Sequence, residues 1–319
     1  MVFAWNWKQY RFYIVTLATV LLFAGTISAI LANVGPSTAL HDSHGKPKHA
    51  IIPQPLLLPH GGRTLFPQYS LVALYGSPDS PALGALGEQS MNASLDRAKQ
   101  LTSLYQPLTT STVLPALEII ATTASASPTD NGDYSRQSDA HSLLPWIIAA
   151  QKAGDYVILD LQPGRSDFLS QAKQYQDLLR FPNVGLALDP EWRLKPDQVH
   201  LAQIGSVDAA EINQTSTWLA QLTAENRLPQ KLLLLHQFRL SMITNRESLD
   251  TTHPELATVI QMDGSGNQEQ KQATYKTITQ NAPPGVHFGW KNFYKQDSPM
   301  LPPQDTIKVT PVPGYISYQ

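Results

Sequence analysis

The chain has 319 residues and a net charge of -2, and 15% of its residues are charged. It contains no cysteine, which excludes disulfides, thiolate metal sites and thiol nucleophiles. The same absence excludes an anchor built on a lipid-modified cysteine. No long basic stretch is present, so nucleic acid is not expected as a partner.

The N-terminal region has the pattern of a membrane or export segment. No charged residue occurs from Phe12 to Val34, and about 20 apolar residues are enough to cross a bilayer as a helix. Residues 1–11 carry Lys8 and Arg11, which favours a cytoplasmic N-terminus. We therefore expect a transmembrane helix over 12–34 that anchors the rest of the chain outside the cytoplasm. The alternative is a signal peptide whose cleavage releases a secreted protein.

Residues 35–68 are expected to form a linker, because their prolines disfavour regular structure. The end of the linker, around Leu65 and Phe66, is expected to pack on the domain that follows. Several histidines in this region could bind a metal, but a solvated linker is the favoured interpretation.

Residues 69–319 alternate between short apolar runs and amphipathic stretches, which is typical of βαβ units and a parallel sheet. The expected helices span 94–105, 166–180, 209–227 and 267–280. The expected strands are Leu71–Tyr75, Val113–Ile120, Tyr156–Asp160, Val184–Asp189, Lys231–His236, Thr258–Met262, Val286–Trp290 and Tyr315–Tyr318. Eight such strands predict an α/β protein with a closed (β/α)8 barrel. An open doubly wound sheet is the alternative, but no glycine-rich phosphate turn follows the first strand.

Ionisable or aromatic residues occur at almost every carboxyl end of these strands, where the active sites of such barrels lie. Turn and helix-capping chemistry explains any one of them equally well. The whole set favours a polar pocket. Its members are Tyr75, Glu118, Asp160, Arg165, Asp189, Glu191, Trp192, His236, Asp263, Trp290, Lys291 and Tyr318.

The most informative pattern is Asp189-Pro190-Glu191, because residues i and i+2 of a strand point to the same face. Their Cβ atoms would lie about 6–7 Å apart. Close carboxylates raise one pKa and so create a general acid, and two carboxylates on either side of a bond are what glycoside hydrolysis needs. Glu191 is the expected acid, and Asp189 or Asp160 the base or stabiliser.

The other members of the set are expected to bind substrate. Tyr75, Trp192, Trp290 and Tyr318 offer aromatic faces for sugar rings. Glu118, His236 and Asp263 would orient substrate or water. Arg165 could bind an anionic group, or could neutralise a carboxylate in a structural salt bridge. A Schiff base on Lys291 is the less favoured alternative to an ion-paired lysine.

Leu188-Asp189-Pro190-Glu191 resembles the fourth-strand Asp-x-Glu of glycoside-hydrolase-like (β/α)8 barrels of the chitinase-like and lysozyme-like families. The resemblance implies that Glu191 is the acid and that Asp189 assists it. The upstream positions of the chitinase-like motif are Leu186-Ala187-Leu188 here, not aspartates. The chain also resembles secreted bacterial barrel proteins of unassigned function, which implies location and fold only.

We therefore expect a hydrolase that acts on an extracellular or cell-envelope glycan. The alternative is a non-catalytic barrel that binds a glycan or a partner protein. A third class, a structural envelope barrel, would have its carboxylates neutralised by arginines. A metal site is an open alternative, because oxygen and nitrogen donors could converge from the third to the sixth strand: Asp160, Asp189, Glu191, His236 and Asp263. No His-x-His or His-Glu-x-x-His spacing occurs, so no metal or other cofactor is expected.

Overall fold

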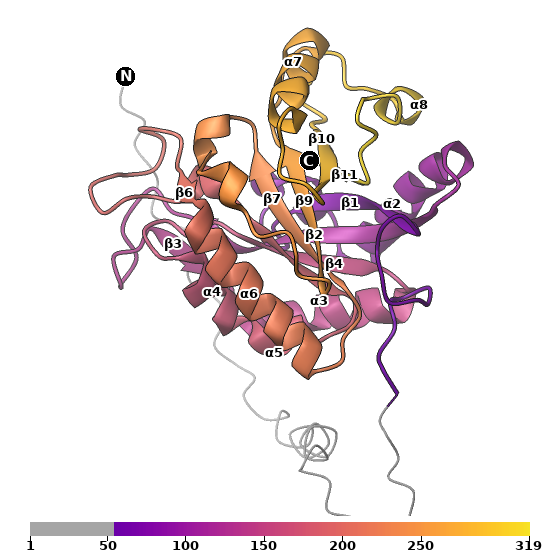
Figure 1. The fold of residues 1–319 in the computed structure, drawn as a ribbon, viewed down its shortest axis with the longest axis horizontal. Coiled ribbons are helices and arrows are strands. Elements are labelled where there is room, and N and C mark those ends of the chain that lie inside the picture. The colour runs from indigo at the N-terminus through magenta and orange to yellow at the C-terminus, as the bar shows by residue number, and fades with distance from the viewer. Residues whose placement is uncertain (1–53) are drawn as a thin grey trace, which may run out of the picture. The chain divides into compact units, whose positions relative to one another are not determined.

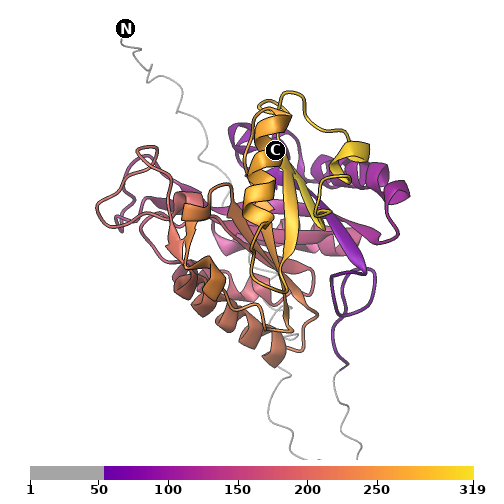
Figure 2. The ribbon, with the colours of Figure 1, turned by 45° about the horizontal axis from the view of Figure 1, so that its top comes forward.

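The computed structural model describes residues 54–319. Eight parallel strands of these residues close into a barrel, and Figures 1 and 2 show the arrangement of the strands and helices. The strands are β1 (Tyr69–Gly76), β2 (Thr112–Ala124), β4 (Tyr156–Leu161), β5 (Val184–Leu188), β7 (Lys231–Gln237), β9 (Leu256–Met262), β10 (His287–Asn292) and β11 (Tyr315–Tyr318). Each strand pairs with the next, and β1 pairs with both β2 and β11, which closes the ring. The predicted barrel and all eight predicted strand positions are therefore confirmed.

Helices on the outside of the ring connect most of the strands (Figure 1). They are α2 (Met91–Tyr105), α3 (Ala140–Ala153), α4 (Phe168–Gln174), α5 (Gln176–Leu179), α6 (Ala209–Glu225), α7 (Gln268–Thr279) and the short α8 (Pro303–Thr306). The helix expected over 166–180 is divided at Tyr175, whose hydroxyl donates to the backbone carbonyls of Ala121 and Ser138. Helix α3 was not predicted, and it contains Pro145.

Short elements complete the loops between the strands and helices. Strand β3 (Ser135–Gln137) pairs antiparallel with the end of β2, and β6 (Val207–Asp208) pairs with β8 (Ile243–Thr244). The connection from β7 to β9 contains no α-helix, only β8 and the 3-10 helices η5 (Leu240–Met242) and η6 (Arg246–Ser248). The other 3-10 helices are η1 (Pro81–Leu83), η2 (Ala85–Glu88), η3 (Gln106–Leu108) and η4 (Pro190–Trp192).

The strands bury both faces, and each face has its own apolar cluster. The outward side chains pack against the helices, as Val157 and Leu186 do. The inward side chains fill the lower part of the barrel, as Leu71 and Leu234 do. Burial on both faces explains why the strand sequences are nearly continuous apolar runs.

The compact unit begins at Pro55. Leu58 and Leu65 are 2% and 0% exposed and belong to the cluster inside the barrel, so they close its lower end. The Arg63 guanidinium donates to the backbone carbonyls of Arg227 and Leu228, which ties this segment to the loop before β7. The last part of the segment expected to be a linker thus packs on the barrel.

The expected cytoplasmic segment 1–11, the transmembrane or signal helix 12–34 and most of the linker lie outside the described residues. Between residues 54 and 319, no helix combines the length and the apolar character that crossing a membrane requires.

Candidate active site

A pocket of ≈ 540 Å³ opens at the carboxyl ends of the strands. Its polar lining includes Gln162, Asp189, Glu191, Asp263 and Lys291. Its aromatic lining is Tyr75, Trp192, Phe238 and Phe293, and Leu83 and Leu201 add exposed apolar surface. The pocket therefore lies where active sites lie in this fold.

Strand alternation carries polar side chains into the upper part of the barrel. On β2 the inward positions run Leu114, Ala116, Glu118, and on β7 they run Leu232, Leu234, His236. The same period places Asp160, Gln261, Lys291 and Ser317 in the lumen. The interior thus changes from apolar at its base to polar under the pocket.

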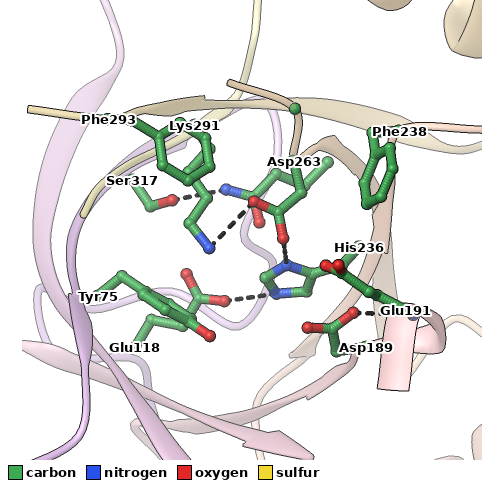
Figure 3. A network of polar contacts seen from close by, with 12 residues as sticks. Tyr75, Glu118, Asp189, Glu191, His236, Phe238, Asp263, Lys291, Phe293 and Ser317 are labelled. Atoms are coloured by element: carbon green, nitrogen blue, oxygen red, sulfur yellow. Dashed lines mark hydrogen bonds and ion pairs between the residues drawn. The ribbon is translucent and has the colours of Figure 1, made fainter. Parts of the chain in front are cut away.

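These polar side chains form a chain of buried contacts, shown in Figure 3. Glu118 Oε1 lies 2.7 Å from His236 Nε2, and His236 Nδ1 lies 2.6 Å from Asp263 Oδ2. The other oxygen of Asp263, Oδ1, is 3.1 Å from Lys291 Nζ. The Tyr315 hydroxyl donates to Glu118 Oε2 at 2.7 Å, and Lys291 Nζ lies 3.4 Å from the centre of the Tyr75 ring. Two acids and two bases therefore alternate across the lumen.

The contacts among these buried side chains determine which of them are charged. Burial disfavours a charged imidazole, but Asp263 and Glu118 outweigh it and hold the pKa of His236 well above its usual value. Burial would also raise the pKa of Asp263, but Lys291 and His236 lower that pKa to about 2. The pKa of Lys291 is raised, because the neighbouring carboxylates outweigh its burial. Near neutral pH, His236 and Lys291 are cations and Asp263 is an anion.

Three further carboxyl groups have raised pKa values, in contrast to Asp263. Burial raises the pKa of Asp160 to about 7, and burial also raises the pKa of Asp189 well above its usual value. For Glu191, burial and then the charge of Asp263 raise the pKa to about 7. Asp160 and Asp189 are 0% and 2% exposed, whereas Glu191 is partly exposed in the pocket. The site therefore contains protonated and ionised carboxyl groups side by side.

Asp189 and Glu191 meet in a way that the sequence pattern did not predict. Strand β5 ends at Leu188, and Asp189 caps η4, which contains Glu191. The Glu191 backbone N–H donates to Asp189 Oδ1 at 3.1 Å. The strand spacing of about 6–7 Å between Cβ atoms thus does not apply, since Glu191 is not on the strand. Both carboxyl groups nevertheless line the pocket.

The structure places the predicted site residues in three groups. Tyr75, Asp189, Glu191, Trp192, Asp263 and Lys291 line the pocket. Glu118, Asp160 and His236 lie buried beneath it, where the Tyr75 hydroxyl donates to Asp160 Oδ2 at 3.2 Å. Arg165, Trp290 and Tyr318 are not among the lining residues.

Tyr75, Trp290 and Tyr318 require a correction, because none of these rings can offer a face to a sugar. Tyr75 is 3% exposed, and Lys291 Nζ lies 3.4 Å from the centre of its ring. Trp290 is 0% exposed and packs edge-on against Tyr275 of α7, and the Tyr318 hydroxyl contacts that of Tyr105 on α2. Trp290 and Tyr318 are each one position away from an inward neighbour, Lys291 or Ser317, so alternation turns both rings outward.

The arginines do not neutralise the pocket carboxylates. Arg165 donates to the backbone carbonyl of Gln198 and stacks on Tyr134, and Arg193 pairs with Glu211. Arg239 lies over the ring of Phe238. The charge balance comes from His236 and Lys291 instead, so the structural-barrel alternative lacks the contacts it requires.

Several pocket residues were not singled out from the sequence. Phe238 and Phe293 directly follow β7 and β10, and an extension of strand alternation past each strand, from His236 and from Lys291, would have indicated both. Gln162, whose side chain donates to the Tyr75 hydroxyl, follows the inward Asp160 at the same spacing. Leu83 and Leu201 lie in loops, where no periodicity applies.

Two groups of three side chains are close enough to hold a metal ion: Glu118, Asp160 and His236, and Asp189, His236 and Asp263. The ligand atoms in each group lie within 4.8 Å of one another. Both groups need a free ring nitrogen on His236. Both of its nitrogens already contact carboxylates at 2.7 Å or less, so the arrangement fits an imidazolium cation better than a metal ligand.

No protein family and no curated protein matches this chain. Among solved structures, it is similar to the crystal structure of a xylanase-alpha-amylase inhibitor protein (XAIP-I) in complex with trehalose. The two share 14% sequence identity over 78% of this chain and 92% of that chain, with a TM-score of 0.44. The barrel is therefore established by the strand pairings described above and not by this similarity.

Proposed function

We propose that this protein is a glycoside hydrolase with Glu191 as its general acid. The observation that carries the proposal is the state of Glu191. Its carboxyl group is partly exposed in a pocket at the carboxyl ends of the strands, and burial with the charge of Asp263 raises its pKa to about 7. A carboxylic acid that keeps its proton near neutral pH, beside an ionised carboxylate, is the pairing that glycoside hydrolysis uses.

In the reaction, the bond between the anomeric carbon and the leaving oxygen breaks. The electron pair stays on the leaving oxygen, which takes the proton of Glu191. A water molecule forms the new bond to the anomeric carbon and gives one proton to the Glu191 carboxylate. The products are two free hydroxyl compounds, and the acid is restored.

The lining of the pocket supports a sugar as substrate. Trp192 and Phe238 supply partly exposed aromatic surface, and Gln162 and Lys291 supply hydrogen-bond donors. Mostly apolar walls with a few convergent polar groups are usual for a ligand site. A non-catalytic glycan-binding barrel would use the same walls but would not need a protonated carboxyl group.

The test is the substitution Glu191→Gln. The protein is assayed on a panel of 4-nitrophenyl glycosides and on bacterial envelope polysaccharides, with release of nitrophenol or of reducing ends as the readout. We expect the variant to lose at least about 100-fold in rate, which is typical of a general acid, and to keep its melting temperature. The matched control is Glu225→Gln, at an exposed position on α6. Binding without turnover by the wild type would replace the hydrolase with the glycan-binding barrel.

We further propose that the protein acts outside the cytoplasm, tethered by residues 12–34 or released after their cleavage. The support is the uncharged apolar run itself. Fractionation of cells that express the full chain tests it. Retention in the membrane after alkaline carbonate washing supports the anchor, and a shortened protein in the medium supports cleavage. Full-length protein in the cytoplasmic fraction contradicts both.

A further inference from the structure

The three carboxyl groups that line the pocket are not equivalent. Asp263 contacts a cation with each oxygen, Lys291 Nζ at 3.1 Å and His236 Nδ1 at 2.6 Å. Asp189 accepts the backbone N–H of Glu191. Neither Asp189 nor Glu191 forms an ion pair with any of the residues 54–319. The negative charge of the pocket is therefore concentrated on Asp263.

A second carboxylate stands behind His236. Glu118 Oε1 lies 2.7 Å from His236 Nε2, and the Tyr315 hydroxyl occupies the other oxygen of Glu118. The side chains of Glu118 and His236 are both 0% exposed, so water and salt screen their interaction little. An imidazole that contacts carboxylates through both nitrogens must donate from both, so it is a cation. Glu118 thereby holds the charge that His236 presents to Asp263.

We propose that Asp263 is the ionised partner of Glu191 at the reacting centre, and that Glu118, His236 and Lys291 are positioning residues that keep Asp263 ionised. The inference rests on the proposed hydrolase function and goes beyond the pattern Asp189-x-Glu191. Asp263 takes no proton in the reaction. Its charge stabilises the positive charge that develops on the sugar ring and keeps the proton on Glu191 until the leaving oxygen takes it.

The effect of Asp263 on the pKa of Glu191 can be separated from the effects of the other charged groups around Glu191. Asp263 and Asp189 are acids, whereas Lys291, His236 and Arg239 are cations that favour the ionised form of Glu191. Removing the charge of Asp263 takes an anion away from Lys291 and His236, and it also removes the repulsion between Asp263 and ionised Glu191. Both effects lower the pKa of Glu191, so they cannot cancel each other.

The experiment is a carboxyl-carbon NMR titration of the wild type, Asp263→Asn and Glu118→Gln. In Asp263→Asn the midpoint of Glu191 should fall by at least about 1 pH unit, the usual size of an interaction between close charges. In Glu118→Gln the midpoint of Asp263 should rise from its low value, because His236 loses its second anion. The control is Asp177→Asn, which removes the same charge from an exposed pair with Arg180. An unmoved Glu191 midpoint in Asp263→Asn, or an unmoved Asp263 midpoint in Glu118→Gln, would overturn the inference.

The titration needs no substrate, so this inference and the proposed function can fail separately. If the wild type hydrolyses glycosides but Glu191 titrates identically in Asp263→Asn, the inference fails alone. If the midpoints move as expected and no glycoside is hydrolysed, the charge arrangement stands and the hydrolase proposal fails. In an active enzyme, Asp263→Asn should also lower kcat more than it changes KM, and should move the alkaline limb of the rate profile to lower pH. If Asp263→Asn does not fold, the midpoint of Asp263 in Glu118→Gln decides.

Discussion

Asp160→Asn should stabilise the protein at alkaline pH, although it alters a fully buried residue of the site. Asp160 is 0% exposed, its Oδ2 accepts from the Tyr75 hydroxyl at 3.2 Å, and its Oδ1 has no hydrogen-bond partner. Burial is the main reason that its pKa rises from 3.8 to about 7. An asparagine has nearly the shape of the protonated acid, can accept the same hydrogen bond and cannot ionise.

The magnitude follows from linkage between protonation and folding. Below pH 3.8 both the folded and the unfolded chain hold the proton, and Asp160 contributes nothing to the pH dependence. As the pH rises from 3.8 to about 7 the unfolded chain ionises first, so the wild type loses stability. Because the pKa moves from 3.8 to about 7, the loss is about 4 kcal/mol above pH 7. In a domain of this size it corresponds to roughly 8–16 °C in melting temperature.

Urea denaturation of the wild type and of Asp160→Asn between pH 4 and pH 8 measures this difference. The gain in unfolding free energy should be near zero at pH 4, should grow through the window from 3.8 to about 7, and should then stay constant. Asp177→Asn serves as the control and should show no such growth. A variant that is no more stable than the wild type at pH 8 would refute the reasoning.

Four further predictions follow from the same structure. His236→Ala should cost about 3–5 kcal/mol of unfolding free energy at pH 7, because it removes the cation that lies between the buried carboxyl groups of Glu118 and Asp263; a variant as stable as the wild type in urea denaturation would contradict this. The hydrolase rate should fall as the pH rises through about 7, because Glu191 then loses the proton it must donate; a rate that still increases above pH 8 argues against Glu191 as the acid. Trp192→Ala should weaken oligosaccharide binding, measured by titration calorimetry, with little change in melting temperature. Trp290→Ala should cost about 3–5 kcal/mol of unfolding free energy, measured by scanning calorimetry. A chain that starts at Pro55 should fold. A chain that starts at Tyr69 should lose its cooperative thermal transition, because it lacks Leu58 and Leu65, whose burial contributes about 1.5–3 kcal/mol each.

The sequence was sufficient for the barrel because its strongest signals are local. The eight strands are apolar runs bounded by turn residues, and that pattern reflects burial on both faces. Helix α3 was missed because Pro145 and a polar start interrupt its amphipathic pattern, although Asp139 caps it and Gly154 ends it in the left-handed conformation. The division falls at Tyr175, whose hydroxyl contacts distant backbone carbonyls, and no local pattern contains such contacts.

Predictions for the site fared best where strand alternation applied. Glu118, His236 and Lys291 lie on inward positions of their strands, and strand alternation relates Glu118 to Ala116 and His236 to Leu234 below them. The same count turns Trp290 outward, which shows that position after a strand alone is too weak a criterion. The charge states were beyond the sequence, because they depend on which side chains from β2, β7 and β10 meet in space.

The network of contacts from Glu118 to Lys291 joins residues that are far apart in the sequence, and its first two members, Glu118 and His236, are separated by 118 positions. Each member comes from a different part of the barrel, and none is part of a short motif with its partners. Proteins that share this arrangement will therefore escape searches that compare sequences segment by segment. A search of barrel structures for two acids, a histidine and a lysine at these separations should find them, and in an alignment of true relatives these four positions should change together or not at all.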